Sequence, residues 1–111
     1  MKPPNYPYPT MDEDGYELQI FDENAPEVAP DSQRFEARPG DTVKLVFKYK
    51  SPARNHGTYG SERMWVQITA QREDCLAGKL ESTPQFTDLL NSDSTVKFHP
   101  RHILHFWKPP A

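Results

Sequence analysis

Cysteine is almost absent from the chain, which has a single thiol at Cys75. No disulfide can form within one molecule, so nothing in the sequence requires an oxidising compartment. The first ten residues, MKPPNYPYPT, lack the apolar segment of a secretory signal peptide. No apolar run approaches the roughly 18 residues that a membrane-spanning helix needs. These absences predict a cytoplasmic protein without a membrane segment.

The sequence also lacks the short motifs that mark common catalytic and nucleotide-binding sites. It contains no GxGxxG, no P-loop, no GxSxG and no CxxC. The stretch DEDG at residues 12–15 resembles the start of a calcium loop but lacks the spacing and final glutamate of an EF-hand. Cys75 follows Asp74, and a neighbouring negative charge disfavours the thiolate that a cysteine nucleophile needs. We therefore expect a protein that is not an enzyme and that needs no cofactor.

Proline is abundant, and acidic residues gather near the beginning of the chain. Residues 1–31 hold eight acids and one lysine, a net charge of −7, whereas residues 32–111 hold twelve bases and eight acids, giving +4. Four prolines among the first nine residues favour an extended arm. This arm is either a disordered tail or a ligand segment for an aromatic groove, unless Tyr6 and Tyr8 fix it to its own domain.

This distribution predicts three parts of the chain. Residues 1–33 form an acidic, proline-rich extension that is partly disordered. Residues 34–107 form a β-rich domain, and residues 108–111 form a frayed tail. The length of 111 residues suits one domain and leaves no room for two ordinary ones.

Alternation of apolar and polar side chains predicts two half-buried antiparallel strands, at residues 42–50 and 63–71. The first strand has Val43, Leu45, Phe47 and Tyr49 on one face and Lys44, Lys48 and Lys50 on the other. The second has Met64, Val66 and Ile68 on one face and Trp65 on the other.

Shorter strand patterns occur at residues 15–21, 75–81 and 94–100. Gly78, inside the strand at 75–81, is typical of a bulge or of a corner in a small barrel. Pro84 follows possible capping hydroxyls and predicts one short helix within residues 82–94. The spacing of the strands predicts a mainly β fold of the β-rich α+β kind. We expect a small antiparallel SH3-like barrel or a strongly bent sheet, with one short helix.

Three motifs in residues 60–106 follow a recognisable order. They are Glu62-Arg63-Met64-Trp65-Val66, then Gly78-Lys79-Leu80 with Pro84-Gln85-Phe86, and last Val96-Lys97-Phe98 before His102-Ile103-Leu104. In these motifs the chain resembles DUF2314, the YegJ-like family of bacterial domains of unknown function. The turn before the last strand departs from the family pattern, because residues 92–95 read Ser-Asp-Ser-Thr where such domains often have Gly-Asp. The resemblance implies no established activity or cofactor, and relatives found beside toxin-immunity modules favour a partner-binding role.

Three histidines at three-residue intervals, His99, His102 and His105, are candidate metal ligands. On a helix the first and last of such a series diverge by about 60°. On a strand His102 points away from the other two. Neither geometry brings three imidazoles to one ion, so His56 or a carboxylate would have to complete the site. The sequence favours a structural closing turn, and a metal-binding or metal-sensing domain is the second hypothesis.

Trp65 is the candidate anchor of a binding surface, because alternation turns it away from the apolar face of its strand. It is either exposed or packed under the acidic extension or the loop at residues 51–62. The predicted binding residues are Arg63, Trp65, His56, Arg101 and His102. The lysines of residues 42–50 form either a solvated face with the acidic extension as counter-charge or a surface for single-stranded nucleic acid. The small positive charge of the body disfavours nucleic acid.

The sequence thus predicts a non-enzymatic module that binds another protein, with an immunity-like role as the form that the resemblance implies. Metal binding through the C-terminal histidines is the alternative, and single-stranded nucleic-acid binding is the third hypothesis. Neither a membrane nor a cofactor is expected as a partner.

Overall fold

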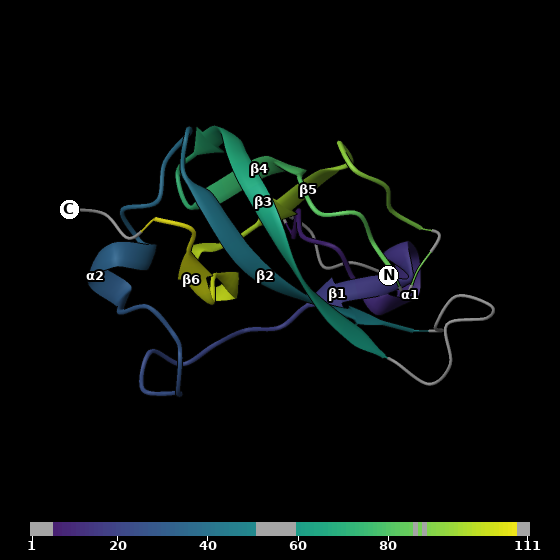
Figure 1. Ribbon diagram of the computed structural model, residues 1–111, viewed down its shortest axis with the longest axis horizontal. Helices are drawn as coiled ribbons and strands as arrows, with labels where there is room; N and C mark the ends of the chain where they lie inside the picture. Colours follow the sequence, from purple (N-terminus) through teal and green to yellow (C-terminus); the bar gives the residue numbers. More distant parts are fainter. Residues whose placement is uncertain (1–5, 51–59, 86, 88, 109–111) are drawn as a thin grey trace.

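The fold is a single curled antiparallel sheet, seen in a computed structural model that describes residues 6–50, 60–85, 87 and 89–108. Its strands are β1 (Tyr16–Leu18), β2 (Thr42–Tyr49), β3 (Ser61–Arg72), β4 (Cys75–Leu80), β5 (Thr95–Phe98) and β6 (His105–Phe106). They lie in the order β1-β2-β3-β4-β5, with β6 pairing with β2, and the sheet curls into a half-barrel (Figure 1). The predicted mainly β fold with a strongly bent sheet is confirmed.

The two α-helices lie elsewhere than predicted, whereas the closing turn expected at the C-terminal histidines is present as a 3₁₀ turn. The structure has α1 (Met11–Asp14), α2 (Asp31–Arg34) and the 3₁₀ turn η1 (Pro100–His102). The short helix predicted within residues 82–94 is wrong, because the described residues of that range contain no helix. Two hydroxyl groups of this segment accept hydrogen bonds from the backbone instead. Ser82 Oγ accepts from Trp65 N, and Thr87 Oγ1 accepts from Leu89 N. Such bonds compete with the helical ladder.

One edge of β2 is shared by two short strands from opposite parts of the chain. β1 pairs with its C-terminal half, with Tyr16 opposite Tyr49, and β6 pairs with its N-terminal half, with Phe106 opposite Val43. Residues 16–18, predicted within a separate extension, therefore belong to the sheet. The predicted boundary between residues 33 and 34 falls inside α2. Residues 1–5 and 109–111 of the predicted extension and tail lie outside the described residues.

The core lies on the concave face of the sheet and follows the predicted alternation. The buried residues of the two long strands are Val43, Leu45, Phe47, Tyr49, Met64, Val66 and Ile68. Leu76, Leu80, Val96 and Phe98 from β4 and β5 join them, and so do Tyr16 and Leu18 from β1. The opposite, convex face is called the outer face below, and it carries the side chains considered as a functional site.

Gly78 lies beside a β-bulge in β3, which confirms its predicted role. The register between β3 and β4 shifts between Ile68 and Ala70, and Gly78 stands opposite Ile68. A Cβ atom at Gly78 would overlap the carbonyl oxygen of Gln67 and lie 2.6 Å from Cγ1 of Val66. Only glycine therefore allows the two backbones to approach this closely.

Replacing Gly78 with alanine is expected to lower the free energy of unfolding by about 2 kcal/mol, because the overlap is with backbone that cannot rotate away. Urea unfolding followed by tryptophan fluorescence measures the change. Gly60→Ala is the matched control, since nothing lies within 4 Å of its added Cβ. A Gly78→Ala variant as stable as Gly60→Ala would show that the strands separate without cost.

Candidate binding surface

Trp65 lies near the middle of the outer face because of the register of three strands. It is opposite Lys44 of β2, and Lys44 is in turn opposite His105 of β6. Side chains directly opposite each other in a sheet point to the same face. The alternation of β3 thus places an indole, an ammonium group and an imidazole in one row across the sheet.

The aromatic rings of this row form a contact cluster with Trp107. The Trp65 ring centroid is 5.1 Å from that of Trp107 and 5.7 Å from that of His105, and the two indoles are almost perpendicular, at 88°. Lys44 Nζ lies 4.5 Å from the Trp65 ring centroid. Trp107 is nevertheless 61% exposed. We call these four residues the tryptophan cluster.

Backbone hydrogen bonds fix the two tryptophans in place. Trp107 N donates to the carbonyl oxygen of Thr42 at 2.9 Å, which continues the pairing of β6 with β2. Trp65 N donates to Ser82 Oγ at 2.9 Å, and Glu81 N donates to the carbonyl oxygen of Trp65. An exposed ring on a fixed backbone offers a large apolar surface at a low cost in conformational entropy.

Two adjoining hollows flank Trp65. The smaller, about 320 Å³, is lined by Thr42, Trp65, Glu81, Ser82 and Trp107, and we call it the tryptophan slot. The larger, about 680 Å³, includes Lys44, Arg63, Glu62 and Gln85 in its lining. Trp65 and Ser82 line both hollows, so the two hollows adjoin at these residues, and we call them together the depression.

Arg63 lies at the far end of this depression in an exchangeable ion pair. Its Nη1 is 3.1 Å from Oε2 of Glu27, and the two side chains are 55% and 60% exposed. Pairs as exposed as this contribute at most about 1 kcal/mol to stability. Glu27 belongs to the acidic part of the chain, so at this point that part does act as a counter-charge to the body. A carboxylate of another molecule can replace it at little cost.

The first two C-terminal histidines complete a turn. His102 is 4% exposed, and its Nδ1 accepts a hydrogen bond from His99 N at 2.9 Å. Nδ1 of His99 accepts in return from Arg101 N. Burial lowers the pKa of His102 to about 4, with a smaller contribution from His99. The rings of both histidines also pack against Tyr8, which thereby fixes the N-terminal arm to the domain.

His105 begins β6, with Ile103 and Leu104 as the link from this turn, and its ring contacts Trp65 instead of the other two histidines. Within residues 6–50, 60–85, 87 and 89–108 no group of three or more His, Cys, Asp or Glu side chains is placed to hold a metal ion. His56, proposed as a completing ligand, lies outside the described residues, as does most of the predicted loop at 51–62.

The five predicted binding residues do not form one patch. Arg63 and Trp65 share the outer face, as predicted. Arg101 lines a different hollow, of about 380 Å³, beside Arg34 and Asp31. His102 is buried, so it is not available to a partner in this structure. Residue 107 was missed, although the alternation of His105, Phe106 and Trp107 would have placed it on the same face as His105.

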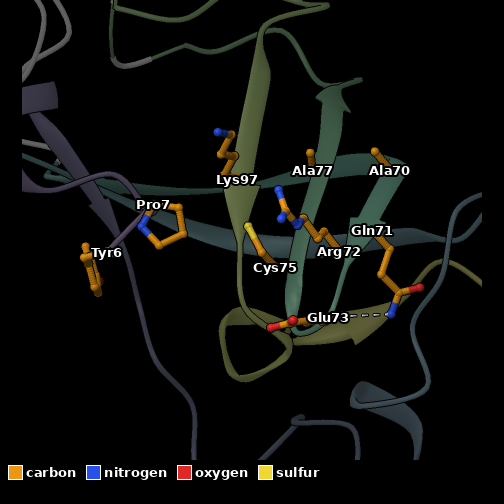
Figure 2. A pocket seen from close by; sticks show the side chains of 9 residues that line it. All are labelled: Tyr6, Pro7, Ala70, Gln71, Arg72, Glu73, Cys75, Ala77 and Lys97. Carbon is orange, nitrogen blue, oxygen red and sulfur yellow. Dashed lines mark hydrogen bonds between the residues drawn. The ribbon is translucent and has the colours of Figure 1, made fainter. Parts of the chain in front are cut away.

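A further hollow, of about 670 Å³, lies on the outer face at the β3–β4 hairpin. Figure 2 shows Arg72, Cys75 and Ala77 on the hairpin side and Tyr6 and Pro7 of the N-terminal arm on the other. Cys75 is half-buried and lines this hollow. The small side chains of Ala70 and Ala77 leave the space open.

Comparison with protein-family models, with curated proteins and with solved structures found no match to this chain. The resemblance to DUF2314 therefore stays a prediction. No helix among the described residues has the length and apolar character needed to cross a membrane.

Proposed function

We propose that the protein is a non-enzymatic module that binds another protein through the tryptophan cluster and the depression beside it. The observation that carries this proposal is the exposed Trp107, fixed perpendicular to Trp65 in the wall of the tryptophan slot, with a second hollow adjoining at Trp65. Tryptophan and arginine are enriched among the residues that dominate binding energy at protein interfaces. Arg63 extends the same surface. The immunity-like role implied by the resemblance to DUF2314 is the finer form of this proposal.

The charges around the depression favour a protein over a nucleic acid. Lys44 and Arg63 are accompanied there by Glu27, Glu62 and Glu81. A phosphate backbone would meet these carboxylates along its path, and neutralisation of phosphates by basic side chains is what drives nucleic-acid binding. A protein surface of mixed charge can pair with both signs.

The proposal is tested by replacing Trp107 with alanine. Proteins retained by the immobilised wild type from a lysate of the source cells are identified, purified and titrated against wild type and variant. Loss of an indole that is buried in the complex is expected to raise the dissociation constant about 30-fold, which is the effect of a hot-spot residue.

Ile20→Ala is the matched control, because Ile20 is an apolar side chain that is 66% exposed and lines another hollow. It should bind as tightly as the wild type. Equal binding by Trp107→Ala and the wild type would exclude this surface as the contact.

A further inference from the structure

The shape of the tryptophan slot limits what part of a partner can enter it. Its two indole walls have centroids 5.1 Å apart and planes at 88°, so they form a narrow corner. An α-helix with its side chains is about 10 Å across and does not fit into such a corner. A single flat side chain does fit into this corner. The slot therefore fits one residue at a time from an extended segment.

The backbone of β3 at the slot cannot accept an added strand. β3 pairs with β2 at Trp65, where Lys44 is its partner, and on its other side the carbonyl oxygen of Trp65 accepts from Glu81 N. Both edges of β3 are thus occupied at this point. A segment that binds against Trp65 therefore contacts it through side chains, and a backbone that needs no strand partner suits this position. Polyproline II is such a conformation, because it has no internal hydrogen bonds and is preformed in proline-rich segments.

The charge of the tryptophan slot favours a particular residue beside the proline of such a proline-rich segment. Its ionisable lining residue is Glu81, which is exposed, whereas Lys44 lines the neighbouring hollow. A carboxylate beside an apolar corner favours a cation on the segment that enters. Lysine or arginine next to proline supplies the cation, and the proline ring supplies a flat apolar face for the indoles.

We infer that the tryptophan slot receives a proline-rich segment of the partner, in the polyproline II conformation, with lysine or arginine beside the proline. This inference rests on the proposed function and names the chemistry of the partner. Ser82 and the indole groups can donate hydrogen bonds to the carbonyl groups that a polyproline II backbone leaves unpaired.

The probe is a synthetic peptide of alternating Pro-Pro-Lys units, titrated into the full chain by calorimetry. Saturable binding is expected, weakened at least about tenfold in Trp107→Ala. Glu81→Gln should lower the affinity for the lysine peptide several-fold. It should leave unchanged the affinity for a second peptide in which glutamine replaces each lysine. Ile20→Ala should bind the lysine peptide as the wild type does.

The inference is overturned if a glycine-serine peptide with the same lysines binds equally well, or if no saturable binding occurs at millimolar peptide. Tighter binding of oligothymidylate, lost in Trp107→Ala, would assign the slot to nucleic acid. If the purified partner depends on Trp107 but the proline peptide does not bind, only this inference fails. If the partner does not depend on Trp107, the proposed function fails at this surface.

Discussion

Replacing Arg34 with methionine is expected to lower the free energy of unfolding by about 3 kcal/mol, because it removes a buried guanidinium and leaves the carbonyl groups of Phe21 and Ile103 without this donor. The Arg34 side chain is 1% exposed. Its Nη1 donates to the carbonyl oxygens of Phe21 at 3.0 Å, Arg101 at 3.3 Å and Ile103 at 3.4 Å. Methionine keeps most of the apolar stem but none of the donors. The ion pair with Asp31 contributes less, since that carboxylate is partly exposed.

Arg38→Met is the control for Arg34→Met, because Arg38 is an exposed arginine in the same segment. Its effect should stay within about 0.5 kcal/mol. Urea unfolding of both variants under the same conditions gives the comparison. Equal stability of the two variants would mean that the carbonyl groups of Phe21 and Ile103 find other donors when the guanidinium is removed, as the carbonyl group of Arg101 already has one in Phe21 N.

Acid is expected to weaken the fold through His102. The pKa of His102 is lowered to about 4 in the folded protein, chiefly by burial, against about 6.5 for an unfolded histidine. The unfolded chain therefore binds the proton first as the pH falls. The contribution of neutral His102 is complete above pH 6.5 and is lost as the pH falls towards 4, by about 3 kcal/mol in total. Protonation of Nδ1 would also remove the acceptor for His99 N.

Comparison with His102→Gln separates this effect from that of the carboxylates. The variant is expected to be less stable than the wild type at pH 7, because it loses the buried ring. Its disadvantage should shrink by about 3 kcal/mol between pH 7 and 4, because only the wild type has this histidine to protonate. Denaturant unfolding at several pH values measures both proteins. A stability difference that does not change with pH would contradict the lowered pKa.

The two long strands were predictable because their signal is local. In β2 and β3 every second residue faces the core, so alternation in the sequence predicts which side chains lie on the core face and which on the outer face. The same rule placed Trp65 on the outer face. The role of Gly78 was predictable for a related reason, since a glycine inside a strand often marks a bulge or a close approach of two backbones.

The burial of Arg34 and His102 was not predictable, because their partners are remote in the sequence. Arg34 contacts carbonyl groups of residues 21, 101 and 103, which only the folded chain brings together. His102 is buried beneath Tyr8 of the N-terminal arm. The helix expected in residues 82–94 is absent for a different reason, since the hydroxyl groups of Ser82, a candidate cap, and of Thr87 bind other backbone groups.

The shared edge of β2 has a consequence for the rate of folding. The β2–β3–β4 meander joins strands that follow one another in sequence, so little chain entropy is lost when they pair. The pairing of Val43 with Phe106 joins residues 63 positions apart and closes a long loop. Such remote pairings slow folding to the range of milliseconds to seconds. We expect the meander to form first and β6 to dock late, so the tryptophan cluster, which needs both, is assembled in the last step.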